Sequence, residues 1–371
     1  MDESTAHKDT SPVLTEIPRF EAPPEAARQA GRSFAPAFQV PPLNGVLFLL
    51  TLLTTTIAGA DMAGAFISLG HPIASIANLS AGLSFSIPLM LILLAHEMGH
   101  YITARRHGVD SSLPYFIPAP FPSIFFIGTF GAFIRMRSQP RTRRTMFDIG
   151  AAGPWAGFVV ALIAILIGLK RSQVTPLDTS QGGLQLGNSI IFWGVSRLVL
   201  GVDPDTINVN LDAMAFAGWI GLFVTTLNLL PVGQLDGGHV VYSLFGGRWH
   251  HLVSRLFTLG CLLMVLVPVT SNYLFHTNLT FWGGWLLWFA IVIFLGLGHP
   301  STLDPETPLA GNRRWAAWAT VALFIGTFSP VPAWFAPPGA PPSEDQGRQI
   351  NVIHRAPARH VHTVNGFTIR L

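Results

Sequence analysis

Cysteine is almost missing from this chain. Cys261 is the single cysteine among 371 residues, and it stands in an apolar run. One cysteine excludes an intrachain disulfide, and it also excludes a zinc site built from several thiolates. If the protein binds zinc, histidine and carboxylate side chains must hold the ion.

Charge is scarce as well. Only 11% of the residues are charged, 50% are hydrophobic, and the mean hydropathy is +0.46. This composition excludes an ordinary soluble protein and predicts an integral membrane protein that lies in a lipid bilayer. The formal net charge of +3 is modest, and no nucleic-acid partner is expected. The basic residues matter through their positions, because they orient membrane spans.

Long apolar runs take the place of charge. We predict an all-α polytopic membrane protein with about seven transmembrane helices, each near the ~20 residues that a bilayer requires. The expected spans are Leu43–Ala60, Gly82–Thr103, Phe147–Leu169, Ala213–Leu230, Leu252–Val269, Leu279–Leu297 and Trp315–Phe335. Two further apolar stretches, Met62–Leu83 and Ser189–Leu200, are too rich in glycine or too short for a span, and either could lie along the membrane surface.

Basic residues gather at particular ends of the predicted spans. Arg105 and Arg106 follow the second span, and a group of five arginines precedes the third. Such ends are expected on the cytoplasmic side of the membrane. Lys170, Arg171 and Arg197 fall on the opposite side, so most but not all of the basic residues follow this cytoplasmic preference.

A metal-binding pattern lies in the second span. His96, Glu97 and His100 form an HExxH sequence inside an apolar run, near its expected cytoplasmic end. Residues four apart share one face of a helix, so both imidazoles can bind one metal ion while Glu97 lies near its water ligand. Ionisable side chains in a membrane span are retained mostly for function. Polar residues that only hold helices together are the simpler alternative.

A catalytic zinc ion generally has three protein ligands and one open position. In one class of soluble zinc peptidases the pattern continues as HExxHxxGxxH, but Thr103 and Arg106 stand at the corresponding positions here. A distant carboxylate is preferable, and Asp236 follows a later span at the same expected depth. Pro231 would end or kink the preceding helix, and neighbouring glycines would let Asp236 turn toward the metal.

An apolar segment between two basic loops does not suit a regular span. Residues 113–134 contain four prolines, and both flanks are expected on the cytoplasmic side. We predict a re-entrant apolar hairpin near the active site, where protein or a water-filled cavity satisfies its backbone. Ile124–Ile134 favours a β-strand, whose edge could receive an extended substrate strand. Alternatively, the segment is a loop that only plugs the helix bundle.

Two further segments accompany the HExxH sequence. Asn228–Pro231 followed by Leu235–Gly237 has the form NxxPxxxxDG, and Phe147–Gly157 contains an Ala-Gly-Pro sequence. Over about Gly82–Gly238, the chain thereby resembles the site-2 protease family of intramembrane zinc metalloproteases. The chain also resembles the branch that includes plant plastid members and their bacterial relatives. This resemblance rests on the combination of Gly128–Ala132, Phe147–Ile149 and a late His299-Pro300 that is followed by Asp304 and Thr307-Pro308.

The resemblance implies a site and a substrate class. One Zn²⁺ per chain would be held by His96, His100 and Asp236, with Glu97 activating water and Asn228 positioning or polarising the substrate. The substrates would be transmembrane proteins, cut within or near their spans in regulated intramembrane proteolysis. Some family members carry a PDZ module, but the stretch between the third and fourth spans is too short for one.

These features divide the chain into parts and suggest where it resides. We expect a flexible cytoplasmic arm at 1–42, a first span and membrane-associated loop at 43–81, a catalytic membrane core at 82–250, further spans at 251–336 with a cytoplasmic linker at 298–314, and a polar tail at 337–371. No signal peptide is evident in the arm, and its Asp2, Glu3 and Glu16 are unlike an acid-poor transit peptide. A bacterial plasma membrane is favoured.

Two other classes of protein compete with a protease. A metal transporter would also place histidine and carboxylate inside the membrane, although it has little reason to keep Glu97 next to the first ligand. A non-catalytic scaffold related to the protease is the second alternative. Such relatives often lose the base or a ligand, whereas all four positions are present here.

Overall fold

The computed structural model describes residues 41–65, 72–121, 126–176, 183–202, 207–336 and 349–351. The predicted arm at 1–42 and the predicted tail at 337–371 lie almost entirely outside the described residues. Every helix and strand below belongs to the unit 41–371.

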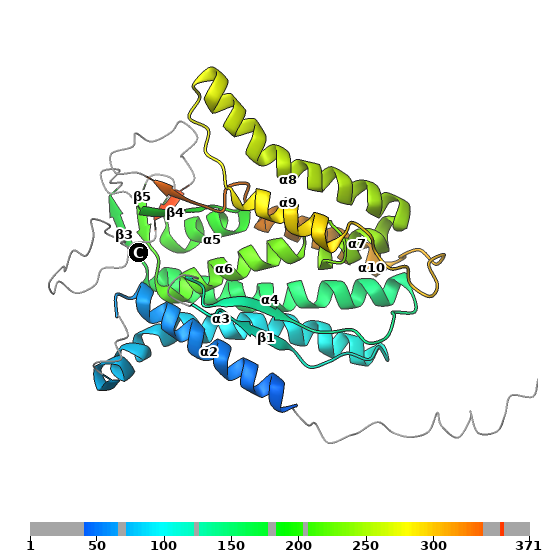
Figure 1. Ribbon diagram of the computed structural model, residues 1–371, viewed down its shortest axis with the longest axis horizontal. Helices are drawn as coiled ribbons and strands as arrows, with labels where there is room; N and C mark the ends of the chain where they lie inside the picture. The colour runs from blue at the N-terminus through cyan, green and yellow to red at the C-terminus, as the bar shows by residue number, and fades with distance from the viewer. Residues whose placement is uncertain are drawn as a thin grey trace, which may run out of the picture. The chain divides into compact units, whose positions relative to one another are not determined.

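Helices dominate the described residues (Figure 1). The helices are α2 (Pro42–Met62), α3 (Pro72–Arg106), α4 (Arg143–Arg171), α5 (Ile190–Leu200), α6 (Ala213–Asn228), α7 (Asp236–Phe245), α8 (Gly247–Phe275), α9 (Gly284–Leu295) and α10 (Asn312–Thr327). The strands are β1 (Tyr115–Pro118), β2 (Thr129–Phe133), β3 (Gln173–Pro176), β4 (Gly183–Gly187), β5 (Ile207–Asn210), β6 (Ala333–Ala336) and β7 (Gln349–Asn351).

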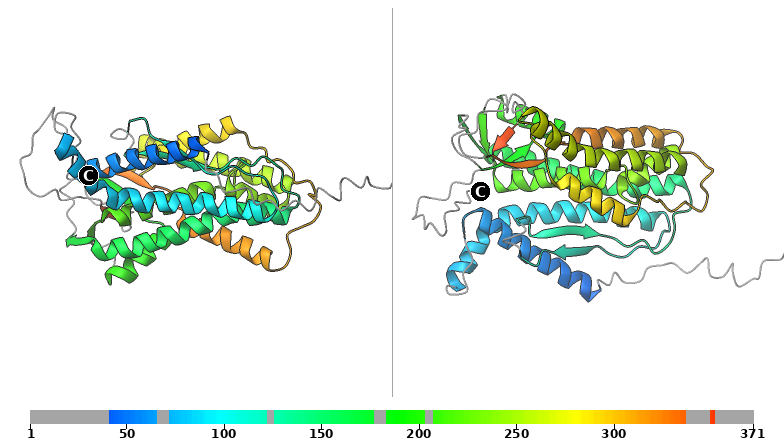
Figure 2. Two further views of the ribbon diagram at one scale, coloured as in Figure 1. Left: turned by 90° about the horizontal axis from the view of Figure 1, so that it is seen from below. Right: turned by 45° about the horizontal axis from the view of Figure 1, so that its top comes forward.

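Three helices form the centre of this unit. Helices α3, α4 and α6 pack against one another, with α2 and the strands β1 and β2 on the α3 side. Helix α7 packs between α4 and α8, and α9 lies along α8 (Figures 1 and 2). The buried side chains Phe85, Ile92, Ile165 and Ile220 join the three central helices in one apolar core.

The same helices are apolar on their outer faces. Leu91 of α3, Ile163 of α4 and Leu256 of α8 are about half exposed, at 51%, 50% and 60%. A helix that is hydrophobic all round suits a lipid environment, because no polar face is available for water. Among the described residues, α2, α4, α8 and the Ala77–Arg106 part of α3 are long and apolar enough to cross a membrane.

Helices α6, α9 and α10 are shorter than the spans predicted there, whereas α5 matches the stretch predicted to be too short for a span. Helices α5, α6 and α9 each have 10–17 residues. Helix α10 ends at Thr327, whereas the predicted span continued to Phe335. Pro330 and Pro332 stand just beyond that end, and proline cannot continue a helix without loss of a backbone hydrogen bond. The mostly helical fold is confirmed, and the number of seven spans stays a prediction.

Short antiparallel sheets accompany the helices, which an all-α class does not anticipate. Strand β3 pairs with β5, and β4 pairs with both β6 and β7. Strands β1 and β2 form a hairpin inside the apolar segment 113–134, with Tyr115 opposite Phe133 and Phe116 opposite Ala132. This hairpin lies against α2 and α3. Of the predicted strand Ile124–Ile134, residues 124 and 125 lie outside the described part.

Candidate active site

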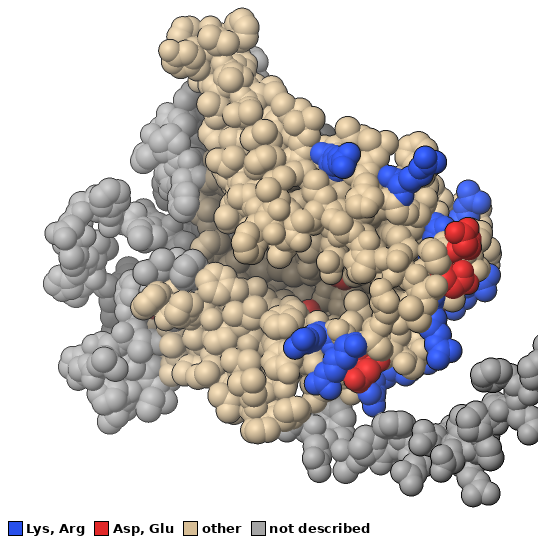
Figure 3. All heavy atoms as spheres, turned by 45° about the vertical axis from the view of Figure 1, so that its right-hand side comes forward, with Lys and Arg blue, Asp and Glu red and all other residues tan. Residues whose placement is uncertain are grey.

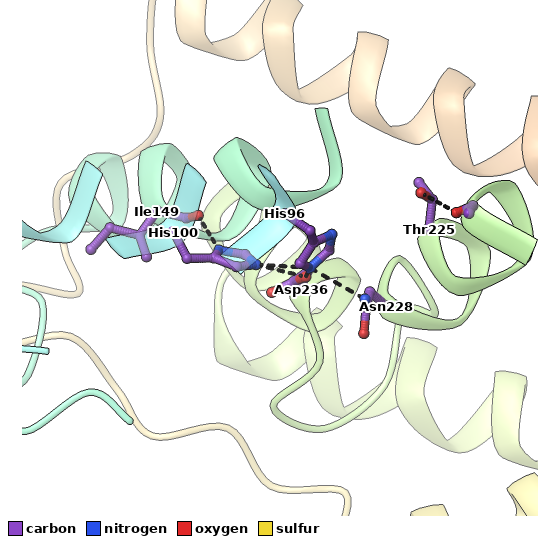
Figure 4. Close-up of polar contacts among 7 residues, drawn as sticks. His96, His100, Ile149, Thr225, Asn228 and Asp236 are labelled. Carbon is purple, nitrogen blue, oxygen red and sulfur yellow. Dashed lines mark hydrogen bonds and ion pairs between the residues drawn. The ribbon is translucent and has the colours of Figure 1, made fainter. Parts of the chain in front are cut away.

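Two helices bring the three predicted ligands together (Figure 4). His96 and His100 come from α3, and Asp236 is the first residue of α7. The two imidazole Nε2 atoms lie 3.1 Å apart. Asp236 Oδ2 lies 3.4 Å from Nε2 of His96 and 3.2 Å from Nε2 of His100. Residues separated by well over a hundred positions therefore present three ligand atoms to one point.

The spacing of these atoms fits zinc. A tetrahedral ion with bonds of 2.0–2.1 Å separates its ligand atoms by about 3.3 Å. The three measured separations, 3.1, 3.2 and 3.4 Å, bracket that value. Two imidazoles and a carboxylate also form a donor set of the kind that catalytic zinc sites use.

The orientation of His100 is fixed by its other ring nitrogen. His100 Nδ1 lies 2.8 Å from the carbonyl oxygen of Ile149, which can accept a hydrogen bond only from a protonated Nδ1. This tautomer leaves the Nε2 lone pair for a metal, an arrangement typical of histidine ligands. Gly153 makes room for the ring, because a Cβ atom there would collide with His100 Nε2. The Ala-Gly-Pro sequence of α4 thus has a steric role beside the ligand.

Glu97 is buried beside the ligands. Its side chain is 6% exposed and interacts electrostatically with His96, His100 and Asp236. The backbone N–H of Ile134, just after β2, points toward its carboxylate. The hairpin strand that was predicted near the active site is therefore tied directly to the predicted base.

Asn228 is the last residue of α6 and faces the same point. Its Nδ2 lies 3.2 Å from His96 Nε2. Helix α6 ends here because Pro231 follows in the tight turn that leads to α7.

Asp236 begins α7, and this position favours a carboxylate. Burial alone would raise its pKa, but the adjacent His100 and His96 imidazoles hold the pKa of Asp236 well below its usual value. The positive end of the α7 dipole acts in the same direction. The neighbouring glycine has a different role from the predicted one: Gly237 lies inside α7, where a Cβ atom would collide with the carbonyl of Leu229. Close packing, not backbone freedom, explains it.

The ligands lie in a cleft of about 580 Å³. Its wall includes residues 132–140, which are the end of β2 and the segment after it, together with the turn before α7 and Pro300. Figure 3 shows a hollow on this face with acidic atoms inside it and basic side chains along one side and at the adjoining end. The cleft gives the three ligand atoms access from outside the helix bundle.

The cleft also contains a histidine that the sequence analysis missed. His239 is buried, lines the cleft, and places its Nδ1 2.7 Å from His299 Nε2. His299 Nδ1 lies 2.6 Å from its neighbour's carbonyl oxygen, Pro300 O, so Nε2 is the acceptor from His239. Burial lowers the pKa of His239 to about 4 and the pKa of His299 to about 3, so both are neutral at pH 7. His239 lies three residues after Asp236 on the same face of α7, and this spacing could have indicated its place beside the ligands.

Comparison with known proteins agrees with this geometry. The sequence model described as "Peptidase family M50" matches residues 84–268. The chain is 26% identical over 335 residues to "Probable zinc metalloprotease EGY2, chloroplastic" of Arabidopsis thaliana, covering 90% of this chain and 54% of that protein. It is 36% identical over 175 residues to "Probable zinc metalloprotease EGY1, chloroplastic" of the same plant, covering 45% of this chain and 30% of that protein. The chain spans about half the length of the EGY2 relatives.

The fold and the site define a class, that of helical proteins with an HExxH-plus-aspartate zinc centre set among apolar helices. Residues 84–268 belong to peptidase family M50, the site-2 proteases, and the chain is homologous to the EGY zinc metalloproteases of plants. Zinc is the cofactor that this membership implies, and the cluster of His96, His100 and Asp236 is compatible with it.

Proposed function

We propose that this chain is an intramembrane zinc metalloprotease that hydrolyses peptide bonds within or near transmembrane segments of membrane proteins. One observation carries the proposal: the ligand atoms of His96, His100 and Asp236 lie within 4.8 Å of one another, on apolar helices, next to the buried Glu97. Its placement in a pathway of regulated intramembrane proteolysis is part of the same proposal and follows the family membership.

The chemistry follows from the residues around the ligands. Zinc held by His96, His100 and Asp236 would act as a Lewis acid and lower the pKa of a water ligand toward neutrality. Glu97 accepts the proton of the attacking water and returns it to the leaving nitrogen of the substrate. The Asn228 amide donates a hydrogen bond to the substrate carbonyl oxygen as negative charge develops there. The N–H of Ile134 keeps the Glu97 carboxylate in place between these two transfers.

An extended substrate can pair with the chain after β2. Ser112 N–H donates to Arg135 O at 2.9 Å, and Arg137 N–H donates to Asp110 O at 2.8 Å. Met136, which lies between them opposite Ser111, therefore turns its own N–H and C=O away from residues 110–112. Met136 lines the cleft, so this edge faces the space beside the ligands. A substrate strand that adds here presents its backbone to Glu97, as in strand addition to a sheet edge.

The membrane placement is proposed with the activity. About seven spans require that α6, α9 and α10 cross the bilayer together with the four longer helices, and the hairpin β1–β2 enters from the side on which it leaves. The basic side chains that gather at one end in Figure 3 support a site that opens to the cytoplasm. We propose a bacterial plasma membrane as the location, whereas the plant relatives are named as chloroplast proteins.

Zinc dependence in vesicles tests the proposal against a transporter. The chain is reconstituted with single-span substrates, stripped with a chelator and reloaded with zinc. Cleavage should disappear on stripping and return at one Zn²⁺ per chain, with no zinc flux across the vesicle wall. Zinc flux without cleavage would favour a transporter, and stoichiometric zinc with neither activity would favour a scaffold.

A further inference from the structure

Two arginines at the cleft have no function in the proposed reaction. Arg135 and Arg137 both line the cleft and are both exposed. Within the part of the chain that the structure describes, no carboxylate lies within 4 Å of the Arg135 guanidinium. Arg137 has only a loose pairing with Asp110, at 3.9 Å between two side chains that are more than half exposed. An exposed pair of this kind contributes little free energy and is easily exchanged for another partner.

When zinc is bound, the two arginines would leave the cleft with a net positive charge. Glu97 and Asp236 are the only acidic residues among those described that line it, and both belong to the zinc site. Two carboxylates balance the charge of one Zn²⁺ ion. Arg135 and Arg137 are then uncompensated, and their positive field extends into the cleft.

The backbone aims both side chains toward the same face. From Phe133 to Arg137 exposed and half-buried residues alternate, as in an extended chain whose successive side chains point to opposite sides. Arg135 and Arg137 therefore share one face of the segment that offers Met136 to a substrate strand. Side chains opposite one another on paired strands lie about 5 Å apart, within reach of a guanidinium. Three residues of extended chain, from Ile134 beside Glu97 to Arg137, span about 10 Å.

We infer that Arg135 and Arg137 select substrates that carry Asp or Glu within about three residues of the cut bond, on the side toward the arginines. This inference rests on the proposed function and adds a substrate class to it. A guanidinium binds a carboxylate through charge-assisted hydrogen bonds, often two in parallel. A basic residue at the same substrate position meets two like charges and is disfavoured.

The selection opposes the usual distribution of charge in membrane proteins. Most transmembrane segments carry Lys or Arg at their cytoplasmic ends. If the site opens to the cytoplasm, those flanks meet Arg135 and Arg137 first. Spans with acidic or neutral cytoplasmic flanks are then the favoured substrates, and ordinary spans are spared.

A matched set of substrates tests the inference in vesicles of neutral lipid. One single-span substrate is made with Asp, Asn or Lys at each of the three positions beside the cut bond, and kcat/KM is measured at low and high salt. At one of the three positions, we expect kcat/KM for the Asp substrate to exceed that for the Asn substrate about fivefold and that for the Lys substrate more than tenfold. These differences should shrink as salt screens the charges. R135E with R137E should reverse the order and prefer Lys. R144Q, which removes an exposed arginine outside the cleft wall, should keep the wild-type order.

The outcomes separate this inference from the proposed function. Cleavage that needs Glu97 but is equal for Asp, Asn and Lys would overturn the selection and leave the protease intact. Rates that follow the content of anionic lipid, and not the charge of the substrate, would overturn it in favour of headgroup binding by the arginines. Absence of any Glu97-dependent cleavage by zinc-loaded protein would instead contradict the proposed function.

Discussion

Asn228 Nδ2 lies 3.2 Å from His96 Nε2, the nitrogen that also faces Asp236 Oδ2 at 3.4 Å. An amide N–H and a metal ion cannot use one nitrogen lone pair together. Zinc held by His96 would occupy this lone pair, and the Asn228 amide would then be free to donate to another acceptor beside the site. The contact supports the proposal that Asn228 donates a hydrogen bond to the substrate carbonyl.

Asn228→Ala should therefore act on the reaction and not on metal binding. Removal of a donor to a developing oxyanion costs on the order of 100-fold in kcat. We expect a loss of that size with zinc still bound at one ion per chain, measured by cleavage assay and metal analysis of the same sample. A variant that loses zinc and activity in parallel would assign Asn228 to the support of His96 instead.

Gly153→Ala should displace a ligand. A methyl group at this position collides with the His100 ring, so the ring must leave its place near Asp236. We expect at least a tenfold weaker affinity for zinc and a matching loss of cleavage, measured by competition with a fluorescent chelator. Gly260→Ala in α8 is the control, because a Cβ atom there meets nothing within 4 Å. Normal zinc affinity in Gly153→Ala would contradict the steric role of the glycine.

Asp236→Asn tests the third ligand. An amide oxygen is a poorer zinc ligand than a carboxylate, and the substitution leaves one negative charge fewer beside the ion. The purified variant should contain well below one zinc per chain after dialysis, with cleavage lost in proportion. Glu306→Gln removes an exposed carboxylate outside the cleft wall and should retain full zinc. Full zinc in Asp236→Asn would mean that another group completes the site.

The His239–His299 pair predicts how stability depends on pH. Burial lowers the pKa of the two imidazoles to about 4 and about 3, below the ~6.5 expected in the unfolded chain. Between pH 6.5 and about 4 the unfolded chain therefore binds more protons, and the free energy of unfolding falls as the pH decreases. Above pH 6.5 both histidines are neutral in either state, and their contribution is constant.

His299→Gln should flatten this dependence. One of the two titrating groups is removed, so the thermal midpoint in detergent should fall less between pH 6.5 and 4 than it does in the wild type. His276→Asn alters an exposed histidine and serves as the control. If the thermal midpoint depended on pH to the same extent in His299→Gln and in the wild type, the pair would not titrate as inferred.

Much of the candidate site could be predicted from residue spacing. The i and i+4 positions of His96 and His100 require only a helix, and Asp236 was expected at their depth because Pro231 ends the preceding helix. The long helices followed from apolar runs, since their outer faces as well as their inner faces are hydrophobic.

Contacts between distant segments could not be predicted in this way. Ile134 reaches Glu97 through its backbone N–H, which no side-chain pattern reveals. His299 meets His239 across sixty residues of chain, and only the packing of the loop after α9 against α7 brings them together. The short strands outside the predicted hairpin were missed because three to five residues carry little periodic signal, as with β4 between β6 and β7.

The proposed reaction depends most on Glu97 as the base beside three zinc ligands. The direct measurement compares the wild type with Glu97→Gln, both zinc-loaded in vesicles with one single-span substrate, and determines the masses of all products. We predict that the wild type cuts a bond within or near the transmembrane segment, whereas Glu97→Gln keeps its zinc and yields no product. Equal cleavage of the same bond by both proteins would contradict it.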